Sequence, residues 1–190
     1  DQTDEEEKPN EGQRPTEGTG QQTNPQTDQN PSQAQEQESS SLKKGAAFTS
    51  GSLRYRVTQK AAPGKNGQAA VIGLATGKAR KINKLKIPAV VAASATGERY
   101  QVTSIGARAF KGNKQLQQVS VGKQVKTIGK QAFQNCKKLK SVKGMFGLVQ
   151  MGDGAFSGCT SLSKITLEKK VRKIGNRAFQ GCKKLKNITI

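Results

Sequence analysis

The sequence has no histidine and no tryptophan, and it has only three cysteines among 190 residues. Without histidine, the chain lacks the side chain that most often acts as acid, base or metal ligand near neutral pH. A Ser-His-Asp or Cys-His nucleophile is therefore excluded within this chain. Because no Cys-x-x-Cys pair is present either, we expect no structural zinc, no cofactor and no enzymatic activity.

Long hydrophobic runs are also missing. No segment approaches the eighteen or more apolar residues of a membrane-spanning helix, so we expect a soluble chain without a membrane span. No signal peptide is visible, since position 1 is Asp and the first forty residues are polar. This fits a mature secreted chain whose signal was removed, or a trimmed chain, and the sequence does not separate the two.

Acidic residues are scarce after the first quarter of the chain. Residues 1–42 contain ten acidic and two basic side chains, whereas residues 43–190 contain three acidic and thirty-one basic ones. The formal net charge of +20 thus hides an acidic arm of −8 joined to a body of +28.

The arm contains almost no apolar side chains. Up to Leu42 the only other aliphatic residue is Ala34, and four prolines are spaced along the segment. Such a segment cannot bury enough apolar surface to offset the entropy lost on ordering. Residues 1–45 are therefore predicted to be a disordered, acidic, Gln- and Pro-rich linker. Two roles stay open for it, a stalk through a cell-wall layer and a solubilising tail.

Residues 46–104 are predicted to be a β-rich N-terminal cap with a degenerate first coil. Leu53, Tyr55 and Val57 alternate with polar residues, and the apolar run 70–74 follows a turn-rich break, so the two segments are expected to pair as a hairpin. The apolar spacing in 82–87 matches that in 116–121, with an eleven-residue insertion before the next coil. We place this insertion in a second hairpin around Gly97.

Residues 105–190 repeat with a period of 23. Four phenylalanines, four leucines, four glycines and four alanines keep this step, as do two columns of β-branched or sulfur-containing apolar residues: Phe110, Phe133, Phe156 and Phe179; Leu116, Leu139, Leu162 and Leu185; Gly106, Gly129, Gly152 and Gly175; Ala109, Ala132, Ala155 and Ala178; Val119, Val142, Ile165 and Ile188; and Ile105, Ile128, Met151 and Ile174. A fixed period of about 20–30 residues with apolar positions in register predicts a solenoid, whose stacked coils share one core.

Within one repeat, 116–121 and 125–128 are expected to be extended, and residues 130–134 are expected to form one tight helical turn that directs Phe133 inward. The glycine at position 129 and its equivalents are expected to supply a backbone angle that is closed to other residues.

The pattern Ile-Gly-x-x-Ala-Phe-x-x-Cys-x-x-Leu-x-x-Ile-x-Ile, seen from Ile128 and again from Ile174 to Ile190, resembles the BspA-type leucine-rich repeat family of bacterial surface proteins. The resemblance implies a right-handed solenoid, secretion or bacterial cell-surface display, and adhesion rather than catalysis. The predicted fold class is thus a β-rich (α+β) right-handed leucine-rich repeat solenoid with a β-hairpin cap. Asn113 stands where later coils have Cys, and Gly144 stands where an apolar residue is expected. The apolar stretch 146–151 predicts a bulge or a local sticky patch.

Cys136, Cys159 and Cys182 occupy one repeat position, so their side chains are expected to form a ladder. Metal ligation and a disulfide between neighbouring coils are two alternatives. The interpretation we favour is that each cysteine is a small buried filler equivalent to Asn113.

Lysine and arginine recur at the exposed positions of the coils. The candidate contact residues for an anionic partner are Lys137, Lys138, Lys140, Lys183, Lys184, Lys186, Lys169, Lys170, Arg172 and Lys173. Nucleic acid is disfavoured because its readers interleave aromatic residues for base stacking, and four of the eight aromatic residues here belong to the repeat core.

The sequence thus predicts a monomeric, non-enzymatic binding or adhesion module, with an anionic cell-wall or host glycan, or a host or bacterial surface protein, as partner. Two alternatives stay open: the basic residues serve solubility alone, or the chain is a structural spacer within a longer surface protein.

Overall fold

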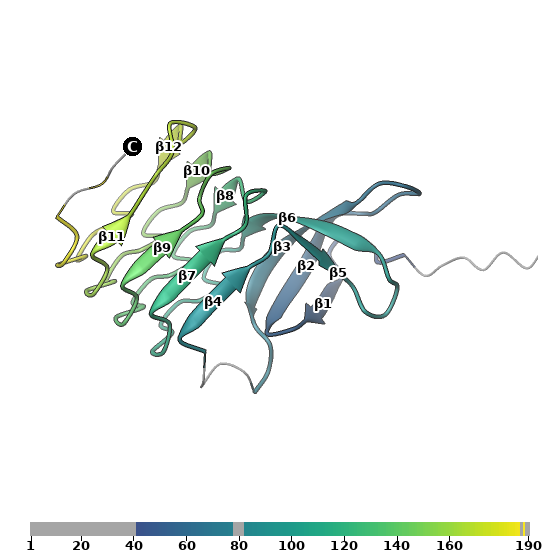
Figure 1. Ribbon diagram of the computed structural model, residues 1–190, viewed down its shortest axis with the longest axis horizontal. Coiled ribbons are helices and arrows are strands. Elements are labelled where there is room, and N and C mark those ends of the chain that lie inside the picture. The colour runs from purple at the N-terminus through teal and green to yellow at the C-terminus, as the bar shows by residue number, and fades with distance from the viewer. Residues whose placement is uncertain (1–40, 78–81, 187, 189–190) are drawn as a thin grey trace, which may run out of the picture. The chain divides into compact units, whose positions relative to one another are not determined.

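The computed structural model describes residues 41–77, 82–186 and 188, and within these ranges every regular element is a β-strand (Figure 1). The predicted disordered linker lies outside the described residues as far as residue 40. The N-terminal strands are β1 (Ala47–Ser50), β2 (Leu53–Gln59), β3 (Gly67–Leu74), β4 (Lys84–Ile87), β5 (Val90–Ala92) and β6 (Arg99–Ile105). The repeats contribute β7 (Gln118–Val121), β8 (Thr127–Ile128), β9 (Ser141–Lys143), β10 (Gln150–Met151), β11 (Lys164–Ile165) and β12 (Lys173–Ile174).

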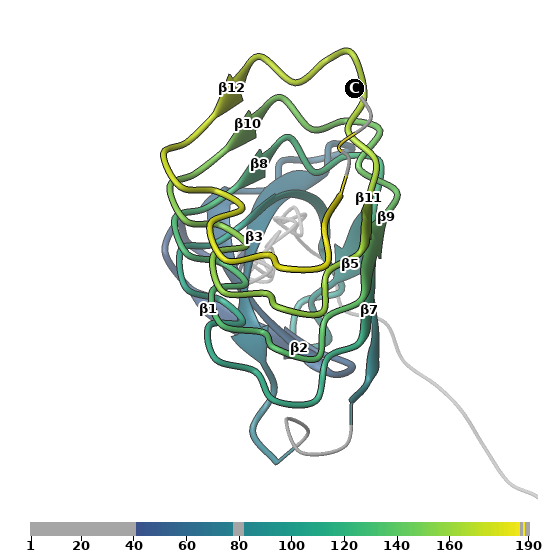
Figure 2. The ribbon, with the colours of Figure 1, turned by 90° about the vertical axis from the view of Figure 1, so that its left-hand side faces the viewer.

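These strands form two sheets. The larger sheet has the order β1-β2-β3-β6-β8-β10-β12, with β5 paired to β6; its β1-β2-β3 part is antiparallel, and from β3 to β12 neighbouring strands are parallel. The four-stranded sheet, β11-β9-β7-β4, is parallel throughout. Figure 2 shows β8, β10 and β12 on one side of the stacked repeats and β7, β9 and β11 on the other.

The pairing register confirms the 23-residue step. In the larger sheet Met151 lies between Ile128 and Ile174, and in the four-stranded sheet Val142 lies between Val119 and Ile165. Leu85 also pairs with Val119, but these two residues are further apart in the sequence than one repeat. The additional residues between them form β5, the turn at Gly97 and most of β6. Parallel neighbours one repeat apart keep each apolar column in line, which makes the core continuous along the stack.

The centre of the repeats is a stack of phenylalanine rings. Ring centroids of consecutive repeats lie 5.1, 5.1 and 5.7 Å apart, with interplanar angles of 15°, 1° and 3°, in the column Phe110, Phe133, Phe156 and Phe179. Leucine, isoleucine and methionine columns surround this stack, and no polar or charged side chain of the described residues is fully buried. The repeats therefore gain their stability from apolar burial between neighbours.

The prediction of a helical turn at 130–134 is wrong. The α+β class is therefore also wrong for the described residues. Gln131 and Asn135 have positive φ values of 57° and 59°, which interrupt a right-handed helical turn. The backbone N–H groups of Gln131 and Phe133 donate to the carbonyl oxygens of Asp153 and Ala155 in the next repeat, at 2.9 and 2.8 Å. The segment forms a series of tight turns because its hydrogen bonds are shared with the neighbouring repeat.

The predicted role of Gly129 is also wrong. Its φ lies outside the left-handed region, as do those of its equivalents. A Cβ atom on Gly129 would instead lie 2.5 Å from the backbone nitrogen of Ala107 in the preceding repeat. The glycine column is thus required by the close approach of neighbouring backbones, since any side chain there would force the repeats apart.

Candidate binding surfaces

The structure places all ten predicted contact residues in exposed positions, but it divides them between two edges of the repeats. The first edge consists of Lys137, Lys138 and Lys140, which precede β9, and of Lys183, Lys184 and Lys186, which occupy the same repeat positions 46 residues later. The second edge leads into β12 of the larger sheet. It consists of Lys169, Lys170 and Arg172, which precede the strand, and Lys173, its first residue. We call these the first and second basic edges.

On the first basic edge, the lysines of two repeats are separated by hydroxyl-bearing residues. The equivalent positions of the intervening repeat are Thr160, Ser161 and Ser163. The Thr160 hydroxyl donates to the Lys137 carbonyl oxygen, at 3.4 Å, as the Ser163 hydroxyl does to that of Lys140. Because neighbouring strands are about 5 Å apart, the two lysine groups lie about 10 Å apart along the stack.

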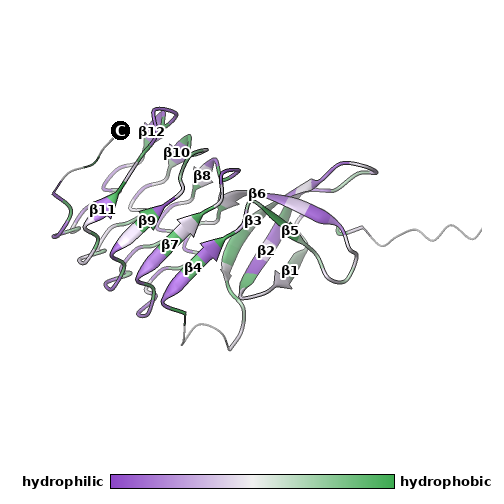
Figure 3. Cartoon of the chain, in the orientation of Figure 1, coloured by the Kyte–Doolittle hydropathy of each residue, from purple (hydrophilic) through white to green (hydrophobic). Residues whose placement is uncertain are grey.

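Four further cations lie on the outer face of the four-stranded sheet, and the sequence analysis did not single them out. They are Lys84, Lys86, Lys143 and Lys164, and all four are exposed. They alternate with buried residues such as Leu85 and Val142, and Figure 3 shows the corresponding change between hydrophilic and hydrophobic colour along β4. The alternation was visible in the sequence, but only the parallel pairing of β4 with β7 showed that these lysines share one face with the repeats.

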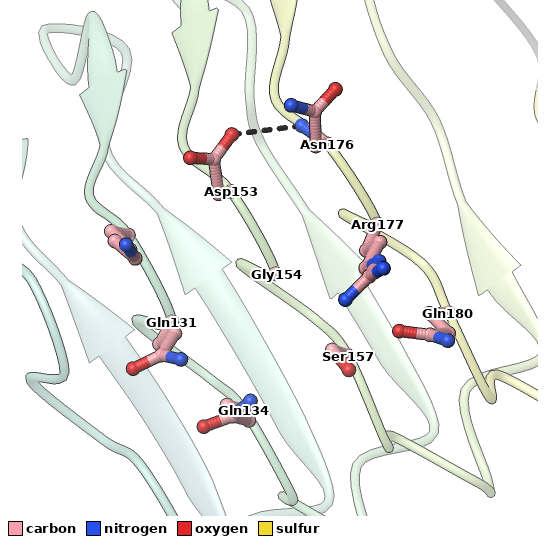
Figure 4. Close-up of a pocket in the computed structure, with 9 residues that line it drawn as sticks. Gln131, Gln134, Asp153, Gly154, Ser157, Asn176, Arg177 and Gln180 are labelled. Atoms are coloured by element: carbon pink, nitrogen blue, oxygen red, sulfur yellow. Dashed lines mark hydrogen bonds between the residues drawn. The ribbon is translucent and has the colours of Figure 1, made fainter.

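A shallow polar trough of about 640 Å³ lies over the turns that connect the sheets (Figure 4). Small residues, Gly154 and Ser157, lie between longer side chains of the neighbouring repeats. One repeat contributes Gln131 and Gln134, and the other contributes Arg177 and Gln180. These amide, hydroxyl and guanidinium groups offer hydrogen-bond donors and acceptors to a polar ligand.

Asp153 lies at the upper end of this trough. One of its carboxylate oxygens accepts a hydrogen bond from the backbone N–H of Asn176, at 2.8 Å. The trough therefore combines a carboxylate with the cations of Lys130 and Arg177, unlike the basic edges, where the exposed charges are all positive.

The three cysteines are free and buried, in agreement with the interpretation as small fillers. Each thiol donates to the carbonyl oxygen of the phenylalanine 26 residues earlier, with Sγ–O distances of 3.1, 3.0 and 3.2 Å for Cys136, Cys159 and Cys182. Burial raises the pKa of the Cys182 thiol, which disfavours a reactive thiolate. The described residues contain no cluster of three or more Cys, Asp or Glu side chains that could hold a metal ion.

Glu98 joins the start of the described chain to the hairpin β5–β6. Its carboxylate accepts hydrogen bonds from the Leu42 backbone N–H, the Thr96 hydroxyl and the Tyr100 hydroxyl, at 3.0, 3.2 and 2.6 Å. Burial alone would raise the pKa of Glu98, but these groups and the nearby Ser41 hydroxyl favour the charged form and lower the pKa to about 2.

We expect Glu98→Gln to lower the melting temperature at pH 7 by about 2–4 °C, a loss of about 1 kcal/mol after discounting for partial exposure. A lowered folded-state pKa stabilises the protein above the unfolded-state value of 4.5. This stabilisation disappears as pH falls through about 2. Melting curves of both proteins from pH 7 to pH 2 should therefore converge below pH 4.5, and a constant difference across this range would contradict the assignment.

Within residues 41–77, 82–186 and 188, no helix has the length and apolar character needed to cross a membrane. No curated protein matches the sequence. Three solved structures are similar over about three quarters of the chain, each with 26% sequence identity. A leucine-rich repeat protein from Bacteroides capillosus aligns with a TM-score of 0.63 over 75% of this chain and 96% of its own.

The other two similar structures are longer. A leucine rich cell surface protein from Faecalibacterium prausnitzii has a TM-score of 0.57 over 76% of this chain, and a leucine-rich repeat protein from Bacteroides ovatus has 0.58 over 75%. The chain spans only 42% and 41% of these two proteins. The BspA type leucine rich repeat region model matches residues 100–190 in six copies. Together with the 23-residue register of the parallel strand pairs in both sheets, this match shows that residues 100–190 are a BspA-type leucine-rich repeat region.

Proposed function

We propose that this chain is a non-enzymatic binding module of a secreted or cell-surface bacterial protein, and that it binds anionic polymers of the cell wall or the host. In this proposal the repeats form a right-handed solenoid closed at its N-terminal end by the β1–β3 antiparallel strands. The observation that carries the proposal is the set of exposed lysines on the first basic edge and on the adjacent face of the four-stranded sheet.

Two observations support binding over a purely solubilising role. The lysines are ordered in rows by backbone hydrogen bonds between repeats, such as the bond from the Lys140 N–H to the Gln117 carbonyl oxygen at 2.7 Å. A regular row of cations can contact a linear polyanion at several points at once. The cell-surface description of the F. prausnitzii relative is consistent with an extracellular ligand.

The test is binding of the full chain to heparin and to teichoic acid, measured by calorimetry at several salt concentrations. We expect affinity to fall linearly in a log–log plot against salt, because each lysine contact releases counterions. Replacing Lys137, Lys138, Lys183 and Lys184 together by Gln should weaken binding about tenfold or more at low salt and leave the melting temperature unchanged.

The matched control removes the same number of charges from residues 43–65, before the repeats, with Gln at Lys43, Lys44, Lys60 and Lys65, all exposed. The control variant should lose much less affinity than the edge variant. Equal losses in both variants would show a response to net charge alone, and salt-independent binding would also contradict the proposal.

The alternative function is a structural spacer within a longer surface protein. It is supported by the two relatives of which this chain spans less than half. A spacer predicts no saturable binding of either polymer at low ionic strength.

A further inference from the structure

One segment in the middle of the repeats carries no cation. Residues 144–163 contain neither lysine nor arginine, although Lys143 and Lys164 border them directly. The first basic edge has lysines on both sides of this segment, and the second basic edge lies after it. A segment whose only charged residue is Asp153 therefore separates two positively charged repeats. Its exposed side chains can therefore contact a ligand by means other than positive charge.

Phe146 is the most exposed large hydrophobic side chain of the described residues, at 61% of its surface. Met145 and Leu148, on either side of Phe146 in the sequence, are buried in the core, and they fix the position of the loop that carries the Phe146 ring. Gly144, with a φ of 82°, stands where the neighbouring repeats have a buried apolar residue. The next residue, Met145, fills the core in its place, so the apolar position is displaced by one residue. A Cβ on Gly147 would collide with the carbonyl oxygen of Lys123, so the loop lies directly against the preceding repeat. The ring is thus held in solvent by a tightly packed loop.

The equivalents of Phe146 in the neighbouring repeats are both lysines, Lys123 and Lys169, and both are exposed. The repeats lie side by side here, because the Val149 N–H donates to the Lys126 carbonyl oxygen and the Arg172 N–H donates to the Val149 carbonyl oxygen, both at 2.8 Å. With about 5 Å between neighbouring strands, the backbones of the two lysines are about 10 Å apart, and Phe146 occupies the same position in the repeat between them.

We propose that the column Lys123, Phe146 and Lys169 binds an acidic polysaccharide in which charged and uncharged sugar rings alternate, with one uncharged ring stacked on Phe146. This inference rests on the proposed function and names its ligand class. The apolar face of a sugar ring complements an exposed aromatic ring, and the acidic groups of the flanking sugars meet the two lysines.

Other polyanions fit this column less well. A polyphosphate chain carries a charge on every unit and has no ring to cover Phe146. Single-stranded nucleic acid is bound by several aromatic residues that stack successive bases, whereas this column displays one. A membrane surface requires a larger apolar face than a single ring provides.

The experiment compares the full chain and its Phe146→Ala variant in calorimetric titrations with two probes. One is a hyaluronan oligosaccharide, in which a uronic acid alternates with an uncharged N-acetylhexosamine, and the other is inorganic polyphosphate of equal charge. We expect Phe146→Ala to weaken hyaluronan binding about two- to tenfold and to leave polyphosphate binding unchanged. Phe146→Tyr keeps the ring and should keep the affinity.

Lys123→Gln with Lys169→Gln should weaken binding of both probes, since these side chains contribute charge. The inference is overturned by an unchanged hyaluronan affinity in Phe146→Ala, by equal losses for both probes, or by a chain that binds polyphosphate but not hyaluronan. A Phe146-dependent loss that is confined to single-stranded DNA or to anionic vesicles also overturns it. A chain that binds none of these probes contradicts the proposed function itself.

Discussion

Replacing Phe156 by Ala should lower the free energy of unfolding by about 3–5 kcal/mol. The ring is fully buried and is stacked on Phe133 and Phe179, with centroid distances of 5.1 and 5.7 Å. Its removal leaves a cavity between repeats whose backbones are tied together on both sides, so the neighbours cannot collapse into the space. Chemical denaturation of the full chain, followed by circular dichroism, measures this change.

Phe146→Ala is the matched control, because it removes the same side chain from the adjoining loop. Since Phe146 is mostly exposed, we expect a change within about 0.5 kcal/mol. A small effect of Phe156→Ala, similar to that of the control, would show that the phenylalanine stack is not a packed core.

The second large effect is expected for Gly152→Ala. The added Cβ would lie 2.6 Å from the backbone nitrogen of Lys130, closer than any normal contact. The repeats would have to separate at this point, which would strain the parallel pairing of β8 with β10. We expect a loss of about 3 kcal/mol, at the upper end of the usual cost of overpacking.

Gly106→Ala provides a graded comparison at the equivalent position of the first repeat. Its Cβ would meet the Val71 carbonyl oxygen at 3.0 Å, so a shift of a few tenths of an ångström relieves the contact. The melting temperature should therefore fall less than in Gly152→Ala. If Gly152→Ala were as stable as the wild type, close approach of the backbones would not explain the glycine column.

The apolar columns could be predicted from the sequence because their 23-residue spacing is visible there. A step of 23 residues aligns Phe133 with Phe156 and Ile128 with Met151 whatever the details of the turns. The eleven-residue insertion was visible for the same reason, since Leu85 and Ile87 repeat the spacing of Val119 and Val121.

The turns could not be predicted, because their conformation depends on hydrogen bonds between repeats. Gln131 suits a helix locally, but its N–H donates to Asp153 of the next repeat, and its backbone is left-handed. The reason for the glycine column could not be predicted either. A Cβ atom at these positions would clash with the backbone of the preceding repeat, and the sequence of a single repeat does not show that contact.

The candidate surfaces were only partly predictable. Exposure of the lysines followed from the columns, but their division into two edges required the strand positions. The exposure of Phe146 depends on the one-residue displacement at Gly144 and Met145, which places Met145 rather than Phe146 in the core. The apolar character of this stretch pointed to a sticky patch without showing which side chain is displayed.

Segment 144–163, which has no cation, also limits the repulsion among the cations of the repeats. Two unit charges about 10 Å apart repel each other by about 0.4 kcal/mol in water, and by twice that at 5 Å. At physiological ionic strength the screening length is about 8 Å, so cations two repeats apart are largely shielded, whereas adjacent ones are not. Lys137 and Lys183 are kept at the larger separation by Thr160, as Lys123 and Lys169 are by Phe146. The segment thus lowers the repulsion within a strongly basic stack of repeats, because it spaces the cations two repeats apart and adds the single carboxylate of Asp153.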